Sequence, residues 1–362
     1  MSSRKKKIFI VAGEASGDIY GALVARGLAL LDNVEIRGWG GAEMTTSGVE
    51  VTQHYRDLAY MGLYEVIVNL KKITENLNRC WEEIESFNPD ALILVDFPGF
   101  NMRIAKKAHK KGINTFQFVA PKIWAWKAGR IKQLAENYTA VFPILPFEDE
   151  LLKRGGVNSI YCGHPLLDSI ENVKKTRGET KVLALLPGSR KQEIKKMLPV
   201  MLEVAAEMDG FNAVIAGAPG LEPQDYKAAN EQGVEVIFGE TRDLLSGAEI
   251  ALITSGTATL EAALLDTPHV LVYRTSKLTY VAAKAVVKVK YIGLPNLILD
   301  RELVPELIQE DCTSRNIISC LKSITKDPSH QLKGFGEIRE KLGNSGASKE
   351  VAKRILEIIN PS

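Results

Sequence analysis

Cysteine is scarce in this chain, and its few cysteines are not spaced as metal ligands. The 362 residues include four cysteines and five histidines, and no two cysteines have the C-x-x-C spacing. This composition argues against a zinc site and against a disulfide framework. We therefore expect reduced thiols.

A large net charge of either sign is also missing. The chain has 46 lysines and arginines against 44 aspartates and glutamates. Proteins that bind nucleic acids usually carry a strongly basic surface. The balance of charge therefore gives no support to a nucleic-acid partner.

Long apolar runs are absent as well. No stretch approaches the roughly 20 apolar residues that a membrane-spanning helix needs. The basic start of the chain precedes only the short apolar run 8–12, and Glu14 and Asp18 follow it, which is unlike a signal peptide. We expect a cytoplasmic protein that is soluble or only peripherally attached to a membrane.

Short apolar runs, each followed by a turn and then by helical periodicity, are what the chain has instead. Runs that are short and apolar throughout are typical of parallel strands buried on both faces. We expect such strands at residues 8–12, 34–38, 91–95, 115–119, 141–145, 182–186, 212–216, 234–238, 250–254 and 270–273.

This alternation predicts an α/β protein with two doubly wound, Rossmann-like domains that face each other across a cleft. We expect one domain at 1–168 and the other at 169–343, because proline and a charged run interrupt the periodicity at 164–179. A last helix, within 344–362, is expected to cross back to the first domain. Exchange of this helix between two copies, giving a homodimer, is an open alternative.

The turn after 182–186 has the features of a phosphate site. Gly188 allows close approach of a ligand, and the backbone N–H groups from Ser189 onward would point at it from a helix N-terminus. Arg190 adds a permanently charged guanidinium that suits phosphate oxygens. Taken alone, the turn is equally typical of a helix start with a surface arginine.

A second turn of the same kind follows 250–254. Ser255, Gly256 and Thr257 offer backbone and hydroxyl donors, and Glu261 lies one helical turn later, where its carboxylate suits two ribose hydroxyls. Together the two turns predict a site for a nucleoside diphosphate.

Asp96 is the first catalytic candidate. It follows the buried strand 91–95 at the carboxyl end, where open parallel sheets bind their ligands. A carboxylate between apolar neighbours can have a raised pKa and act as a general base. The alternative is an ordinary helix N-cap.

Two further loops are expected at the same edge. The turn 13–18 carries two acids, which discourage phosphate and favour ligand hydroxyls, and it lacks both G-x-x-x-x-G-K-[ST] and the full G-x-G-x-x-G. The loop 120–126, with two tryptophans beside Lys127 and Arg130, suits a sugar face and a phosphate. It is equally consistent with core that closes a domain.

Apolar stripes with lysine rims suggest contact with a membrane surface. The stripe before Lys71 and Lys72 suits insertion among anionic headgroups, and periodicity alone fits a core-facing helix equally well. A second stripe, 278–290, has three lysines, and a helix is expected at 306–310. The proposed membrane contacts are Met61, Leu63, Val66, Ile67 and Leu70.

Seven blocks, in order along the chain, together resemble the lipid-A-disaccharide synthase family. They are Gly13-Glu-Ala-Ser-Gly-Asp18, Met61-Gly-Leu-Tyr-Glu-Val66, Asp96-Phe-Pro-Gly-Phe-Asn101, Trp124-Ala-Trp126, Leu186-Pro-Gly-Ser-Arg190, Ser255-Gly-Thr-Ala-Thr-Leu-Glu261 and Leu294-Pro-Asn-Leu297. The resemblance implies a GT-B fold and a place in lipid A biosynthesis of Gram-negative bacteria. The implied reaction is inverting transfer of 2,3-diacylglucosamine from UDP to the 6-hydroxyl of 2,3-diacylglucosamine 1-phosphate (lipid X).

The resemblance also implies roles for particular residues. Asp96 would take the proton of the attacking hydroxyl, with Glu14 as a second catalytic carboxylate. Arg190, the helix N-terminus at 255–257 and Arg274 would stabilise the departing diphosphate, so that no metal or other cofactor is expected. The remaining residues expected to line the cleft are Ser16, Asn101, Trp126 and Asn296, with Glu261 on the ribose.

The acylated substrates would hold the enzyme at the anionic inner face of the cytoplasmic membrane. The family commonly has a second acid where this chain has Gly99, which removes one alternative base. The rival enzymes are other UDP-sugar users of the same architecture, a UDP-N-acetylglucosamine 2-epimerase or a peptidoglycan glycosyltransferase. A nucleotide-binding membrane scaffold is the rival without catalysis.

Overall fold

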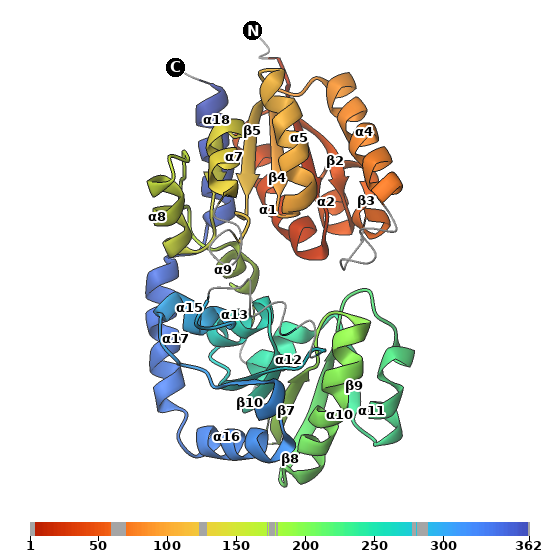
Figure 1. Ribbon diagram of the computed structural model, residues 1–362, viewed down its shortest axis with the longest axis vertical. Helices are drawn as coiled ribbons and strands as arrows, with labels where there is room; N and C mark the ends of the chain where they lie inside the picture. The colour runs from red at the N-terminus through yellow and green to blue at the C-terminus, as the bar shows by residue number, and fades with distance from the viewer. Residues whose placement is uncertain are drawn as a thin grey trace. The chain divides into compact units, whose positions relative to one another are not determined.

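The computed structural model describes residues 4–58, 70–122, 129–171, 173, 178, 180–276, 280 and 289–360; for Leu70 it describes the backbone alone. The chain divides into two compact units (Figure 1). The first is Met1–Asp168 together with Ser345–Ser362, and the second is Ser169–Asn344.

The first unit is a six-stranded parallel sheet covered by helices. Its strands lie in the order β3-β2-β1-β4-β5-β6. Its elements are β1 (Lys6–Ala12), α1 (Ala15–Leu31), β2 (Val34–Gly40), α2 (Ala42–Thr46), β3 (Glu50–His54), η1 (Tyr55–Leu58), α4 (Leu70–Phe87), β4 (Ala91–Val95), α5 (Pro98–Lys110), β5 (Asn114–Phe118), α7 (Arg130–Asn137), β6 (Ala140–Phe142), α8 (Pro146–Arg154), α9 (Pro165–Ile170), which runs into the second unit, and α18 (Ala347–Ile359).

The second unit repeats this topology. Its parallel sheet has the order β12-β11-β10-β7-β8-β9. Counted from β7 and read from the β9 edge, this is the strand order of the first unit. Its elements are β7 (Lys181–Leu186), α10 (Lys191–Glu207), β8 (Phe211–Gly217), η2 (Pro223–Tyr226), α11 (Lys227–Glu231), β9 (Glu235–Phe238), α12 (Thr241–Gly247), β10 (Ile250–Thr254), α13 (Thr257–Leu264), β11 (His269–Tyr273), α15 (Leu294–Leu299), β12 (Glu306–Ile308), η3 (Gln309–Asp311), α16 (Ser314–Lys326) and α17 (Ser329–Leu342).

Strands of continuous apolar sequence are buried on both faces, as predicted. In β7, Leu183 and Leu185 pack into one core cluster, whereas Ala184 and Leu186 pack into the cluster on the other face. Successive side chains of a strand point to opposite faces, so a run with no polar position requires a helix layer on each side. This accounts for the doubly wound architecture.

The predictions were least accurate at the sheet edges. The expected helix at 306–310 is wrong, because Glu306–Ile308 forms β12, which pairs in parallel with β11, and a 3₁₀ turn follows. The edge strand β3 was not predicted, and β6 ends at Phe142, before Pro143. The side chains of β3 and β12 are exposed or half-buried, so these two strands carry little apolar pattern.

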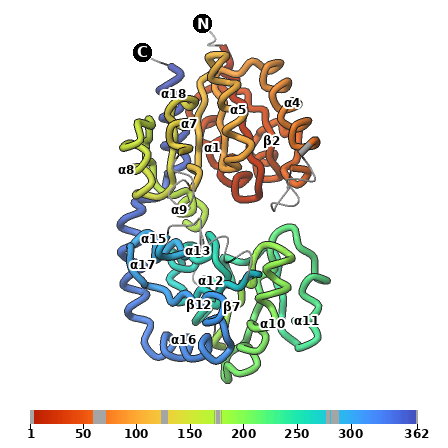
Figure 2. The backbone as a smooth tube through the Cα atoms, viewed as in Figure 1, coloured from red at the N-terminus to blue at the C-terminus, as the bar shows by residue number. Residues whose placement is uncertain are grey.

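The last helix completes the core of the first unit. Val351 and Ile355 of α18 lie in the same apolar cluster as the side chains of α1, and the two helices run side by side (Figure 2). Gly27 permits this packing, since a Cβ there would lie 2.9 Å from the Cβ of Ala352. The Asp168 carboxylate accepts hydrogen bonds from the N–H groups of Gly346, Ala347 and Ser348, at 2.6, 3.1 and 2.9 Å. It thereby caps the start of α18.

Candidate active site

The sheet topology brings the predicted turns of each unit together in pairs. In the first sheet the strand order reverses between β1 and β4, and in the second between β7 and β10. The turns 13–18 and 96–101 follow the first pair, and the turns 188–190 and 255–257 follow the second. Ligands of doubly wound sheets bind in the crevice at this reversal, beyond the carboxyl ends of the strands.

The turn after β4 has an unusual backbone. Asp96 and Phe97 are consecutive residues in the left-handed region, with φ of 47° and 48°. The Phe97 ring lies against the neighbouring turn, because a Cβ on Gly13 would come within 2.3 Å of it. Left-handed backbone at residues other than glycine is uncommon and gathers at functional sites.

Burial raises the pKa of the Asp96 carboxyl, while the positive charge of Lys122 and a hydrogen bond from the Phe97 N–H oppose the rise. The side chain is half-buried. The alternative role as a helix N-cap is not what the structure has, since the N-cap position of α5 is Phe97. A desolvated carboxylate with a raised pKa is suited to accept a proton from a substrate.

Asn101 does not line a ligand site. Its side chain is fully buried, and its amide donates to the carbonyl oxygens of Val95 and Asp96 at 3.3 and 2.7 Å. The expected contact of Asn101 with the acceptor is therefore wrong for this structure. Its polar group is engaged with the backbone of the Asp96 turn.

The turn after β1 holds three acidic or hydroxyl side chains in different surroundings. Glu14 occupies the N-cap position of α1, and Ser16 lies in the first turn; both are half-buried. Asp18 is buried and accepts hydrogen bonds from the N–H groups of Gly41, Glu43 and Met44 at 2.7–3.1 Å. The Asp18 carboxylate therefore stabilises the start of α2, and Glu14 and Ser16 are the half-buried polar side chains of this turn.

The turn after β7 contains an acid that the sequence analysis did not consider. The Glu193 carboxylate accepts a hydrogen bond from the Ser189 N–H at 2.9 Å and pairs with Arg190 at 3.0 Å. Gly188 has φ of 120°, and a Cβ there would lie 2.6 Å from a Glu193 oxygen. The Ser189 N–H, expected to point at a phosphate, is thus occupied by a carboxylate from the first turn of α10. An acid three residues into a helix is a known N-terminal signal that could have identified it.

The turn after β10 is open. Gly256 and Thr257 are exposed, Ser255 is half-buried, and a Cβ on Gly256 would meet nothing. Gly256 is the N-cap residue of α13, so the first N–H groups of this helix lie next to exposed backbone. This arrangement suits an anionic ligand group.

Glu261, the residue predicted to bind the ribose, has a partner that the sequence analysis missed. Glu261 accepts a hydrogen bond from Arg242 Nε at 2.6 Å, and Arg242 also donates to the Ser169 carbonyl at 2.9 Å. The side chain of Glu261 is 14% exposed. Arg242 therefore fixes one oxygen of this carboxylate, and sequence spacing gave no signal for the pairing.

Arg274 and Asn296 have structural partners of their own. Arg274 is half-buried and donates to the Cys312 carbonyl. Asn296 is fully buried, where it accepts from the N–H groups of Leu303 and Val304 and donates to Glu306. The expected contact of Asn296 with substrate is therefore wrong for this structure.

Several predicted residues lie outside the described part of the chain. These are Trp126 and the membrane contacts Met61, Leu63, Val66 and Ile67, together with the side chain of Leu70. Within the described residues, no helix is long and apolar enough to cross a membrane. The same residues contain no group of three His, Cys, Asp or Glu side chains placed to share a metal ion.

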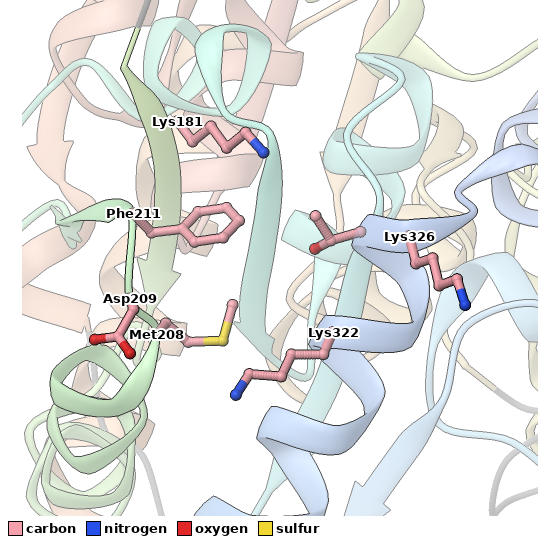
Figure 3. Close-up of a pocket in the computed structure, with 7 residues that line it drawn as sticks. Lys181, Met208, Asp209, Phe211, Lys322 and Lys326 are labelled. Carbon is pink, nitrogen blue, oxygen red and sulfur yellow. The ribbon is translucent and has the colours of Figure 1, made fainter.

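A cavity of about 380 Å³ lies away from these turns (Figure 3). It is bounded by Lys181 and Phe211, the first residues of β7 and β8, and by Lys322 and Lys326 of α16. It therefore opens at the amino ends of the strands. Chemistry at the switch point does not involve this edge of the sheet.

Sequence comparison then assigns the family. The model of the lipid-A-disaccharide synthetase family matches residues 8–351. A lipid-A-disaccharide synthase of Syntrophus aciditrophicus (strain SB) is 34% identical over an alignment of 378 positions, which covers 99% of each chain. The chain belongs to the lipid-A-disaccharide synthetase family.

Comparison with solved structures supports the fold. UDP-GlcNAc 2-epimerase from Neisseria meningitidis, bound to UDP-GlcNAc, superposes with a TM-score of 0.69 at 15% identity and covers 97% of this chain and 100% of its own. The glycotransferase of kitacinnamycin gives 0.67 at 14% identity, with 99% and 100% covered. At these identities the likeness shows the fold alone, which is the GT-B type with two Rossmann-like domains.

Proposed function

We propose that this chain is an inverting glycosyltransferase of lipid A biosynthesis. It moves 2,3-diacylglucosamine from UDP to the 6-hydroxyl of lipid X, and the products are a β-1,6-linked disaccharide and UDP. Family membership supports the reaction. The observation that carries the mechanism is the half-buried Asp96, whose carboxyl has a raised pKa at the switch point of the first sheet.

In the proposed step, Asp96 accepts the proton of the 6-hydroxyl while the hydroxyl oxygen attacks the anomeric carbon of the donor. The bond between that carbon and the diphosphate oxygen breaks, and UDP leaves with the bonding electrons. Attack from the side opposite to UDP inverts the anomeric centre. Glu14 and Ser16 hold hydroxyls of the acceptor sugar from the neighbouring turn.

The second unit supplies the donor site in this proposal. Arg190 and the N-terminus of α13 at 255–257 stabilise the charge that grows on the leaving diphosphate, which is the usual role of preorganised donors. Glu261, held by Arg242, accepts from the ribose hydroxyls. Because these groups carry the charge, we propose that the reaction needs no metal ion.

We also propose that the protein works at the inner face of the cytoplasmic membrane. The acyl chains of both substrates are anchored in lipid, and residues 61–70, followed by Lys71 and Lys72, offer apolar and cationic groups for such a surface. Flotation with vesicles containing anionic phospholipid tests this. L63E/I67E should lower binding to vesicles while retaining turnover of substrates dispersed in detergent, and unchanged binding would refute the assignment.

The decisive assay offers UDP-2,3-diacylglucosamine and lipid X to the purified protein in the presence of EDTA. The expected result is disaccharide and UDP, and a requirement for added metal would refute the metal-free step. UDP-N-acetylglucosamine serves as a control, and no epimer should form from it. With Asp96→Asn, turnover should fall about 10²-fold to 10⁴-fold while UDP binding persists. Unchanged turnover would instead refute the role of Asp96 as general base, whereas no disaccharide from either protein would favour a binding scaffold.

A further inference from the structure

Two buried amide side chains converge on the backbone of the Asp96 turn. The Asp96 carbonyl accepts from Asn101 Nδ2 at 2.7 Å and from Gln117 Nε2 at 3.2 Å. Gln117 Nε2 also lies 3.0 Å from the Val119 carbonyl oxygen. The peptide that joins the two left-handed residues Asp96 and Phe97 is thus held at its carbonyl oxygen by two donors.

The amides reach this peptide from different elements. Gln117 lies on β5 opposite Leu94 of β4, and Asn101 lies in the first turns of α5. Both side chains are fully buried. Neither can therefore contact a substrate directly, and each acts on the site only through the backbone that it binds.

This arrangement is poor for stability. Asn101 Oδ1 and Gln117 Oε1 are buried and have no hydrogen-bond partner among the described residues. Val119, a β-branched residue, has φ of 65° beside the two left-handed residues of the turn. Unsatisfied buried oxygens and left-handed backbone both cost free energy.

We propose that Asn101 and Gln117 are positioning residues that clamp the Asp96 peptide and thereby keep the Asp96 carboxylate in its desolvated place. The inference rests on the proposed role of Asp96 as general base. The charged groups on the neighbouring elements are Lys122, which follows β5, and Glu14 in the turn after β1. Of these, Lys122 acts on the charge of Asp96. Release of the turn therefore changes both the solvation of the Asp96 carboxylate and its distance from Lys122.

The test is Gln117→Met, which keeps the volume of the side chain and removes the donor. We expect kcat to fall about 10-fold to 100-fold, the range seen when groups that support a catalytic residue are removed. The acid limb of the pH profile of kcat/KM should move to lower pH, because a freed carboxylate is better solvated. The Kd for UDP should not change, since the donor groups belong to the second unit.

Gln331→Met is the matched control. Gln331 is another buried glutamine, whose amide exchanges two hydrogen bonds with the His269 backbone in the second unit. Its replacement should lower the melting temperature without moving the acid limb. Acid unfolding of a destabilised variant would move that limb to higher pH, so a move to lower pH separates positioning from stability.

A double-mutant cycle adds a second readout. Asn101→Leu and Gln117→Met remove donors to the same oxygen, and their effects on kcat should therefore not multiply. If Gln117→Met does not fold, Gln117→Asn keeps the polarity and is too short to reach the Asp96 carbonyl. Unchanged kcat and an unchanged acid limb in a folded Gln117 variant would overturn the clamp. Full activity of Asp96→Asn would instead overturn the role of Asp96 as general base, on which the clamp rests.

Discussion

At the scale of single residues, the reactivity of the site follows from burial. The half-buried Asp96 carboxylate is partly desolvated, and the positive charge of Lys122 offsets only part of the cost. Activity should therefore be lost as the pH falls through the raised pKa of this group, because the protonated acid cannot accept a proton from substrate. The acid limb of the pH profile of kcat/KM checks this. Asp96→Asn should remove this acid limb together with the activity.

The same burial predicts that Asp96→Asn stabilises the fold. The folded-state pKa of Asp96 lies above its unfolded value, so the folded protein binds this proton more tightly. The stabilising contribution is complete at pH below the unfolded pKa and is lost as the pH rises through the folded pKa. At neutral pH the variant should therefore have the higher melting temperature, and the gain should disappear in acid. A lower melting temperature at pH 7 would contradict the desolvation argument.

Glu193 gives a second residue-scale prediction. Its carboxylate lies against Ser189 and Arg190, in the proposed place of the diphosphate. Glu193→Gln keeps an acceptor for the Ser189 N–H and removes a like charge, worth about 1 kcal/mol at a partly exposed site. UDP should bind about threefold to tenfold more tightly by calorimetry. Glu203→Gln, an exposed change in the same helix, should have no effect, and weaker binding in Glu193→Gln would show that the acid shapes the turn instead.

The pattern of success at this scale has a physical cause. The turns were predictable because each follows an apolar strand, and parallel strands place their carboxyl ends at one edge. Arg242 and Gln117 were missed because side-chain direction decides their contacts, whereas Glu193 had a signal in the sequence, its place three residues into a helix. Asn101 and Asn296 looked like ligand groups because sequence shows polarity and does not show burial.

At the scale of elements, one carboxylate connects the end of the chain to the first unit. Asp168 caps α18, and α18 packs on α1. The polar edge strand β3 and the short strand β12 were not predicted, because neither has an apolar pattern of its own. Central elements are thus readable from sequence, while edges and caps depend on what lies beside them.

Replacement of the α18 cap should be measurable. Asp168→Ala removes the acceptor of three backbone N–H groups and should lower the unfolding free energy of the first unit by about 1–2 kcal/mol. Hydrogen exchange should become faster at the start of α18 and stay unchanged in the second sheet, which serves as an internal control. Equal exchange in α18 of both proteins would show that packing alone holds the helix.

At the scale of the whole molecule, each unit contains one fully buried, neutral histidine. Burial lowers the pKa of His164 to about 3 and that of His269 to about 4. Unfolding frees both rings to bind protons at their ordinary value near 6.5. Their contribution to stability is therefore complete above pH 6.5 and is lost as the pH falls toward these lowered values, by about 1.4 kcal/mol per pH unit for each ring.

His164→Asn tests this in the first unit. The asparagine oxygen can replace Nδ1 as acceptor for the Leu166 N–H, and it does not titrate. The loss of stability between pH 6.5 and 4 should become shallower, as followed by denaturant unfolding. His330→Asn, at an exposed site, should leave the pH dependence unchanged. An unaltered slope in His164→Asn would mean that His164 is already charged in the folded state.

The packing of α18 in the first unit has a consequence for folding during translation. Residues up to Asp168 are translated before α18, so their apolar layer lacks this helix until residues 347–359 have been translated. The stretch from Ser169 to Asn344 carries all six strands of its own sheet and can close earlier. The first unit therefore begins synthesis first and is completed last. A nascent chain that stalls before α18 exposes an apolar surface of this unit to the quality-control machinery.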